Sequence, residues 1–405
     1  MNVSVLFYVQ HLLGIGHLQR TFRLAAAVAR EGIEVTLVSG GEPLREPIYT
    51  ESVRIVQLPP IRALDATFKK FVGPNGGPID KELQEARRDV LLAAFVSARP
   101  DVIVIEAFPF GRRAFRFEIE PLIEAARSRY PRPRMLCSVR DIVIAPDEAS
   151  RHRDIIDRVR ADFDFVLVHG DPAFIPLEAS FSAAWEIADH VIYTGYIGDS
   201  DQTDGGDEAA GANEVLVSVG GGAVGSALLS TALEARRRGC LASFTWHLLA
   251  GPNLPDPAFG TLARALPEDV ILERYRQDFP SMLRRCRVSV SQAGYNTVLD
   301  ILAARARAVV VPFAAERETE QQLRAERLSA CGVLQLLPEA QLSAPQLAHA
   351  LERAIKCDPQ TISVDTRGAL RSARLIARII CDPASVTRRT NGDFVSPAAG
   401  GIIDA

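Results

Sequence analysis

The sequence predicts two doubly wound α/β domains that face each other across a cleft, and three observations support this. The chain has 405 residues, which is more than one hydrophobic core of about 250 to 300 residues can hold. Short runs rich in β-branched residues alternate with longer helical patterns, as is typical of parallel sheets with crossover helices. A polar stretch rich in glycine and aspartate, residues 199–212, interrupts the alternation. We therefore expect one domain on each side of a linker.

The first domain is expected to span residues 1–198. Its first segment, residues 3–9, is apolar but lacks the basic leader of a signal peptide, so we interpret it as a strand. Strands are predicted at 3–9, 33–38, 53–58, 101–106, 134–139, 164–169 and 190–194. Helices are predicted at 18–31, 80–98, 118–129 and 150–161.

The second domain is expected to span residues 213–365 and to repeat the same pattern. Strands are predicted at 214–219, 242–249, 269–273, 287–291, 307–312 and 333–337. Helices are predicted at 224–238, 278–286, 295–306, 318–330 and 343–356. A last helix, 366–382, is expected to pack back on the first domain, and 383–405 is interpreted as a flexible tail.

The composition excludes several classes of protein. Lysines and arginines number 46 against 50 aspartates and glutamates, a net charge of −4, so no overall positive field is present to hold a nucleic-acid backbone. The 6 cysteines are widely spaced and form no Cys-x-x-Cys pair, which indicates reduced thiols of a cytoplasmic protein. No uninterrupted apolar run is long enough for a membrane-spanning helix.

The first candidate motif, Gly14-Ile15-Gly16-His17, follows the first strand and opens a helix. Glycines at such a turn let a ligand approach closely, and the helix start offers free N–H groups. The positive end of the helix dipole disfavours imidazolium, so His17 is expected to be neutral, as a general base must be. The alternative is a histidine that merely packs beside a tight turn.

Two acids at the ends of neighbouring strands are candidates to support His17. Glu106 ends the fourth predicted strand and is the first choice, because a carboxylate there points into the cleft and can stabilise a protonated histidine. Asp141 occupies a comparable place after the fifth strand and is the second choice. The alternative for either acid is a simple ion pair with a neighbouring arginine, such as Arg112 or Arg140.

The second domain opens with a strand, a glycine-rich turn and a helix start. Gly220, Gly221, Gly222 and Ala223 form this turn, and its backbone N–H groups could cradle a diphosphate. Its spacing matches neither the dinucleotide fingerprint nor a Walker loop, which disfavours nicotinamide and ATP. The alternative is a turn that serves only helix packing.

Three further segments resemble the donor domain of GT-B glycosyltransferases related to family 28, the MurG-like enzymes. They are Ser289–Asp300, Val309–Phe313 and Glu316–Gln322. Together with the Gly-x-Gly-His start and the central glycine turn, they follow the family order over residues 1–382. The strings Glu-Ala-Phe-Pro-Phe-Gly-Arg-Arg and Ser-Gln-Ala-Gly-Tyr-Asn-Thr resemble, more narrowly, a group of predicted bacterial glycosyltransferases.

The resemblance implies roles for individual residues of the second domain. The ribose-binding carboxylate falls on Asp300, for which the alternative is a surface helix acid, and Gly294 opens the helix that faces the pyrophosphate. Contacts to the donor sugar fall on Gln321 and Gln322, and Glu318 could share them. The stretch after Phe313 is about two residues longer than the family pattern. With the glycines above, the expected donor-binding set is Gly14, Gly16, Gly220, Gly221, Gly222, Ala223, Gly294, Tyr295, Asn296, Thr297, Asp300, Glu318, Gln321 and Gln322.

The activity implied by the resemblance is an inverting, metal-independent transfer of a sugar, such as N-acetylglucosamine, from a UDP-sugar to an acceptor hydroxyl. The same implied activity requires no cofactor and no metal. Asp162-Phe163-Asp164 resembles a metal-binding motif, but it starts a strand rather than ending one, so we interpret these acids as solvated or capping residues. Two alternatives stay open: a UDP-sugar hydrolase, in which His17 activates water, and a nucleotide-sugar 2-epimerase. A sugar-nucleotide sensor without catalysis would leave His17 and Glu106 without a task.

The acceptor is expected to be a small molecule, a glycan or a lipid-linked sugar, and the location cytoplasmic. MurG-like enzymes touch the membrane, and two clusters of aromatic and basic residues, 68–71 and 112–117, could provide peripheral contact with its inner face. The alternative for both clusters is ordinary protein surface.

Overall fold

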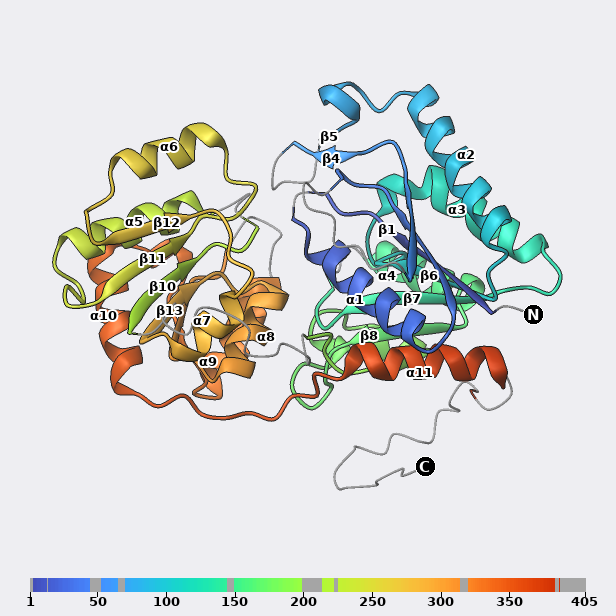
Figure 1. Ribbon diagram of the computed structural model, residues 1–405. Coiled ribbons are helices and arrows are strands. Elements are labelled where there is room, and N and C mark those ends of the chain that lie inside the picture. The colour runs from blue at the N-terminus through green and yellow to red at the C-terminus, as the bar shows by residue number, and fades with distance from the viewer. Residues whose placement is uncertain are drawn as a thin grey trace.

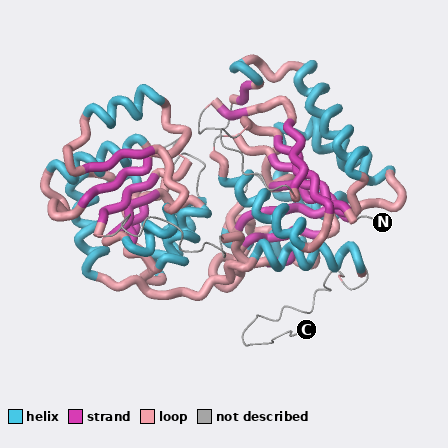
Figure 2. Tube along the Cα trace, viewed as in Figure 1, coloured by secondary structure: helices cyan, strands magenta, loops and turns pink. Residues whose placement is uncertain are grey.

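The computed structural model describes residues 3–12, 14–43, 52–64, 70–143, 149–198, 213–221, 225–313, 320–382 and 386. These residues form two α/β domains, each built on a parallel sheet with helices on both faces (Figures 1 and 2). The predicted fold class is confirmed. The expected linker, 199–212, and nearly all of the expected tail lie outside the described residues.

The sheet of the first domain has the strand order β3-β2-β1-β6-β7-β8-β9, and all its neighbours pair in parallel. The strands are β1 (Ser4–Val9), β2 (Glu34–Ser39), β3 (Val53–Gln57), β6 (Val102–Glu106), β7 (Arg134–Arg140), β8 (Phe165–His169) and β9 (Val191–Tyr193). The helices are α1 (Gly16–Arg30), α2 (Lys81–Ala98), α3 (Arg116–Ser128) and α4 (Ala149–Asp162). Short 3-10 turns lie at Pro74–Gly76, Arg113–Phe115, Leu177–Ala179 and Ala184–Ile187.

The central strands of this sheet are covered on both faces. Every residue of β1, β6 and β8 is buried, as expected for parallel strands, which need helices on each side. One face packs against α1, through residues such as Phe22 and Leu24. The other face packs against α2, α3 and α4, through residues such as Phe95 and Leu122.

The sheet of the second domain has the strand order β12-β11-β10-β13-β14-β15, again entirely parallel. The strands are β10 (Glu214–Ser218), β11 (Thr245–Leu249), β12 (Val270–Glu273), β13 (Val288–Ser291), β14 (Ala308–Val310) and β15 (Gln335–Leu336). The helices are α5 (Ser226–Arg237), α6 (Asp256–Arg264), α7 (Phe279–Arg285), α8 (Tyr295–Ala304), α9 (Glu320–Ala330) and α10 (Ala344–Lys356), with a 3-10 turn at Glu339–Gln341. Helices α5, α6 and α10 pack on one face, and α7, α8 and α9 on the other.

Three short elements differ from the prediction. Helix α6 was not expected, because Pro255, Pro257 and Gly260 mask its periodicity. Strands β4 (Arg62–Ala63) and β5 (Phe71–Val72) form a short antiparallel pair that is too brief to leave a pattern in the sequence.

The last helix, α11 (Gly368–Cys381), belongs spatially to the first domain. After α10 the chain crosses back, and Figure 1 shows α11 beside α1 rather than beside the second sheet. Ala373, Ile376 and Ile379 join the core around α1, and a bridge pairs Ile197 with Arg367. The chain therefore passes between the two domains twice, once after residue 198 and once after α10.

Candidate active site

The residues expected to carry chemistry lie at one edge of the first sheet. Strands β1 and β6 are neighbours, with Tyr8 opposite Ile105, and the strand order reverses between them. Ligands of such sheets bind beyond the carboxyl ends of the strands at this reversal. His17, in the first turn of α1, and Glu106, the last residue of β6, meet there, with Nδ1 2.6 Å from Oε1.

This contact orients the imidazole. An ionised carboxylate can only accept, so Nδ1 of His17 donates to Glu106 and Nε2 keeps its lone pair. The side chain of His17 is 19% exposed, whereas that of Glu106 is 1% exposed. The pair is a partly exposed imidazole with a buried carboxylate behind it, which is the arrangement that a general base requires.

The surrounding charges favour a neutral ring and an ionised acid. Burial lowers the pKa of His17 to about 3, against the opposing effect of Glu106 and with a contribution from the cations of Arg112 and Arg140. Burial would raise the pKa of Glu106, but its contact with His17 and the charges of Arg20 and Arg112 outweigh burial and hold that pKa well below its usual range. The imidazole is thus available as a base near neutral pH.

Arg20 is a member of this cluster that the sequence analysis did not identify. Its guanidinium forms an ion pair with Oε1 of Glu106, and its Nη2 lies 3.3 Å from Nδ1 of His17. The signal was present in the sequence, because residues three apart on a helix share a face and His17 and Arg20 both lie on α1. A second arginine, Arg112, donates from Nε to the carbonyl of Gln10 at 2.7 Å and ties the loop after β6 to the loop after β1.

Asp141, the second choice for the partner of His17, lies elsewhere. It is fully buried after β7 and accepts two hydrogen bonds from Arg324 of the second domain, at 2.8 and 3.1 Å. Tyr196 donates to its Oδ2 at 3.3 Å. None of its contacts is with His17, so the structure gives Asp141 a role in joining the domains.

The glycine turn of the second domain faces the first motif. It follows β10, and Gly220 has the positive φ of 58° that favours glycine. A side chain at Gly221 would come within 3.8 Å of the Cα of Gly14. The next two residues of the expected set, Gly222 and Ala223, lie outside the described residues.

The start of α8 also faces the start of α1. Gly294 caps α8 in an extended conformation. Nδ2 of Asn296, in the first turn, donates to Gln19 of α1 at 3.3 Å, and a side chain at Gly16 would reach within 3.8 Å of that nitrogen. Two helix N-termini therefore meet at the domain boundary, and both offer free N–H groups and positive dipole ends to an anion.

Other members of the expected donor set lie around the same helix start. Thr297 is near the glycine turn, because a side chain at Gly220 would approach its hydroxyl within 3.9 Å. Asp300 is half-buried one turn further along α8. Tyr295, in contrast, is buried and its side chain reaches into the first domain.

The two glutamines assigned to the donor sugar differ in their surroundings. Oε1 of Gln321 accepts from the backbone N–H groups of Ala293 and Phe313, at 3.0 and 3.1 Å, so it fixes two loops. Nε2 of Gln322 donates to Glu326, one turn further along α9, at 2.6 Å. Glu318 lies outside the described residues.

In the described part of the two expected membrane clusters, the aromatic side chains pack against the first domain's core. Phe115 is 1% exposed and packs edge-on against Phe71, Phe117 packs against the same core, and Arg112 is held by Gln10. Residues 112–117 therefore place Phe115 and Phe117 against the core, and the expected membrane contact stays a prediction; residues 65–69 lie outside the described residues. Among the residues that the structure describes, no helix combines the length and the apolar character needed to cross a bilayer.

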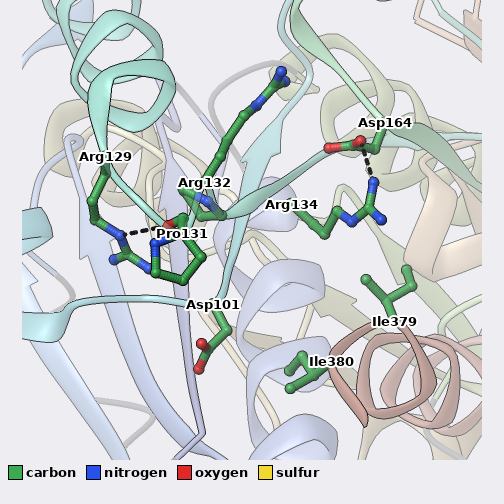
Figure 3. Close-up of a pocket in the computed structure, with 9 residues that line it drawn as sticks. Asp101, Arg129, Pro131, Arg132, Arg134, Asp164, Ile379 and Ile380 are labelled. Atoms are coloured by element: carbon green, nitrogen blue, oxygen red, sulfur yellow. Dashed lines mark hydrogen bonds and ion pairs between the residues drawn. The ribbon is translucent and has the colours of Figure 1, made fainter. Parts of the chain in front are cut away.

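A cavity of about 490 Å³ lies at the other end of the first sheet (Figure 3). Asp101, Arg134 and Asp164 line it next to the amino ends of the strands, and Arg134 pairs with Asp164 at 2.9 Å. This pairing accounts for one acid of the Asp-x-Asp pattern, and Arg127 pairs with the other, Asp162. Within the described ranges, no group of three or more His, Cys, Asp or Glu residues could hold a metal ion.

Comparison with known sequences gives matches that each cover less than half of the chain. Residues 216–378 match the profile of the glycosyltransferase family 28 C-terminal domain. An uncharacterised glycosyltransferase of Methanopyrus kandleri is 30% identical over 105 residues, which are 26% of this chain and 30% of the relative. The N-acetylglucosaminyltransferase of Chromohalobacter salexigens that acts on pyrophosphoryl-undecaprenol-linked N-acetylmuramyl-pentapeptide is 34% identical over 88 residues, 22% of this chain and 24% of the relative. The chain thus matches less than a third of these relatives' length.

Comparison with solved structures covers nearly the whole chain. MurG of Acinetobacter baumannii has a TM-score of 0.55 at 15% identity, over 93% of this chain and 99% of that protein. The calicheamicin glycosyltransferase CalG4 has a TM-score of 0.55 at 18% identity, over 94% of each chain. The spinosyn rhamnosyltransferase SpnG, complexed with thymidine diphosphate, has a TM-score of 0.57 at 15% identity, over 94% of this chain and 96% of that chain. At these identities the likeness concerns the fold.

Proposed function

The chain has the GT-B fold and carries a glycosyltransferase family 28 C-terminal domain at residues 216–378, and from this premise we propose that it is an inverting glycosyltransferase. It would move a sugar, N-acetylglucosamine or a similar one, from a UDP-sugar to an acceptor hydroxyl. The observation that carries the proposal is the contact of His17 with Glu106, opposite the N-terminus of a helix of the family 28 domain.

The reaction proceeds by a single displacement. Nε2 of His17 takes the proton of the acceptor hydroxyl while the hydroxyl oxygen forms a bond to the anomeric carbon. The bond from that carbon to the diphosphate breaks on the opposite face, so the configuration inverts and UDP leaves. Glu106, ionised behind the ring, stabilises the imidazolium that forms.

The leaving diphosphate is proposed to bind between the two facing helix starts. The N-termini of α8 and α1 and the glycine turn after β10 supply N–H donors and positive dipole ends at this point. In this proposal those groups, rather than a metal ion, stabilise the negative charge that develops on the leaving UDP. Asp300, further along α8, would bind the ribose hydroxyls.

Two comparisons support a nucleoside diphosphate donor. The relative from Chromohalobacter salexigens is named for UDP-N-acetylglucosamine, and the match to the family 28 C-terminal domain covers the part of the chain that carries the donor motifs of the second domain. SpnG, of similar fold, was solved with thymidine diphosphate. The Chromohalobacter salexigens relative is named for an acceptor linked to undecaprenol, and we propose lipid-linked and free glycans as the first acceptors to test.

A thermal-shift panel of UDP, UDP-sugars, thymidine diphosphate sugars, NAD and ATP tests the donor. A ligand at a hundred times its dissociation constant stabilises the fold by about 2.7 kcal/mol, and we expect this for a UDP-sugar. Stabilisation by NAD or ATP with none from any UDP compound would overturn the proposal. UDP release with and without an added acceptor then separates transfer from hydrolysis.

Substitution of Asp300 sharpens the donor assignment. Asp300→Ala should weaken UDP and UDP-sugar alike by about 1.5 to 3 kcal/mol, because a carboxylate on ribose is insensitive to the sugar beyond the second phosphate. Gln322→Ala should leave UDP affinity nearly unchanged and reduce discrimination among donor sugars. Calorimetric titration of both ligands measures the difference, and an unchanged UDP affinity in Asp300→Ala would show that the ribose site lies elsewhere.

A further inference from the structure

Tyr295 belongs to the second domain, but its side chain is buried in the first. It is the first residue of α8 and is 6% exposed. Its hydroxyl donates to the carbonyl of His169 at 2.9 Å and accepts from the N–H of Ile197 at 3.0 Å. The helix start that is proposed to hold the donor diphosphate is thus anchored directly in the domain that holds the catalytic base.

Two guanidinium groups lie over the ring of Tyr295. Arg20 is 5.5 Å and Arg324 5.7 Å from the ring centre, distances at which cation–π attraction operates. Arg324 also donates to the carbonyl of Ala293 at 2.8 Å, just before the helix cap, and to Asp141. The start of α8 therefore contacts Arg20 of the first domain through the ring of Tyr295, and Arg324 connects the same helix start to Asp141 of the first domain.

Arg20 connects this anchor to the catalytic pair. Its guanidinium pairs with Glu106, which in turn holds His17. Arg20 is 2% exposed, and its buried Nε has no hydrogen-bond partner among the described residues. The position of the guanidinium thus depends on Glu106 and His17 on one side and on the ring of Tyr295 on the other.

We propose that Tyr295 and Arg20 are positioning residues that transmit the placement of the α8 N-terminus to the His17–Glu106 pair. The inference rests on the proposed function, because it takes α8 as the donor phosphate site. A diphosphate that draws the start of α8 toward itself moves Tyr295, and Arg20 follows the ring and resets Glu106 behind the imidazole. Donor binding then adjusts the position of the carboxylate behind the base.

The alternative is that Tyr295 only packs at the domain boundary, and the titration of His17 distinguishes the two. The charged groups that face the imidazole are Glu106 from β6, Arg20 from α1, Arg112 from the loop after β6 and Arg140 from the end of β7. Removal of Arg20 takes away a cation close to Nδ1 and leaves the carboxylate in place. The pKa of His17 should therefore rise in Arg20→Met, because a positive charge 3.3 Å from Nδ1 is removed.

The test uses the full chain with ¹³C-labelled histidines, followed by NMR in the absence and presence of UDP. The chain has 7 histidines, and His17→Gln identifies the signal of His17. In the wild type, UDP should move this signal and shift its titration. In Tyr295→Leu, UDP should bind with a dissociation constant within about threefold of wild type by calorimetry, yet move the His17 signal by less than about a third as much.

Conservative and control variants separate coupling from packing. Tyr295→Phe keeps the ring that both guanidinium groups contact and should retain most of the response of His17. Phe259→Leu removes another ring under an arginine, Arg274 at 4.4 Å in the second domain, and should leave the response intact. If Tyr295→Leu does not fold, Arg20→Lys, which keeps the charge but not the planar group, should likewise weaken the response.

Each outcome decides between the proposals. UDP binding that leaves His17 unmoved in the wild type, or an equal response in Tyr295→Leu and wild type, overturns the coupling and leaves the donor assignment intact. No UDP binding to the wild type overturns the donor assignment and the coupling with it. A His17 titration unchanged by Arg20→Met overturns the role of Arg20.

Discussion

Glu106 and Asp141 lie at the ends of adjacent strands of one sheet, yet their partners differ. Both carboxylates are buried, at 1% and 0% exposure. Glu106 contacts His17 and Arg20 of its own domain, whereas Asp141 contacts Arg324 of the second domain. The end of a buried strand thus fixes where a carboxylate lies, while its role depends on which element covers that edge of the sheet: α1 over Glu106, and α9 over Asp141.

The largest expected effect follows from disrupting the contact between His17 and Glu106. His17→Ala should lower turnover by about a hundredfold to ten-thousandfold, the usual contribution of a general base. UDP affinity should stay nearly unchanged, because the proposed phosphate site is built mainly by the second domain. Glu106→Gln should give a smaller loss, since the shape is kept but the charge behind the imidazolium is removed. UDP release from the preferred donor and calorimetry with UDP measure the two quantities.

A matched control lies at the opposite end of the same sheet. Asp164 also pairs with an arginine, Arg134, so Asp164→Asn removes a carboxylate without touching the cleft and should retain full turnover. Activity within threefold of wild type in His17→Ala would remove this histidine from the mechanism.

The second-largest expected effect follows from disrupting the ion pair between Asp141 and Arg324. Asp141→Asn leaves Arg324, which is 1% exposed, without its main counterion, and loss of one partner of a buried ion pair costs about 3 to 5 kcal/mol. We expect the lower end, because Glu320 still contacts Arg324 at 2.9 Å. Urea denaturation measures this loss in the free energy of unfolding.

The control for this variant is an exposed ion pair in the second domain. Arg307 pairs with Asp358, whose side chain is 88% exposed, so Asp358→Asn should cost less than about 1 kcal/mol. Equal stability of Asp141→Asn and wild type would show that the pair with Arg324 does not hold the domains together.

The sequence predicted the elements better than the contacts between them. Strand periodicity located β1, β6 and β10 within about one residue, because a strand buried on both faces needs an uninterrupted apolar run. It could not pair Asp141 with Arg324, which lie 183 positions apart, because a contact across domains depends on how the domains dock. The helical spacing of His17 and Arg20 was readable, whereas the insertion of Tyr295 into the first domain left no local pattern.

The smallest expected effect concerns His169, the last residue of β8, at the same edge of the sheet. The next residue, Gly170, packs against Asp141, and the side chain of His169 is fully buried between the hydroxyls of Ser138 and Thr194, at 2.8 Å each. Burial lowers the pKa of His169 to about 3, and the charge of Arg20 adds to this. His169 is therefore neutral in the folded state even at mildly acid pH.

The sign of the resulting pH dependence follows from linkage. As the pH falls through about 6.5, the unfolded chain binds a proton at His169 and the folded chain does not, so the folded state loses stability. Between pH 7 and pH 5.5 this amounts to about 1 kcal/mol, at roughly 1.4 kcal/mol per pH unit below 6.5. His169→Gln should remove that part of the loss, whatever its own cost in stability at pH 7, and urea denaturation of both proteins at the two pH values measures it. An equal loss in variant and wild type would mean that His169 binds its proton equally well in the folded and unfolded states. In that case the negative charge of Glu106, which His169 does not contact, would offset the effect of burial on the pKa of His169.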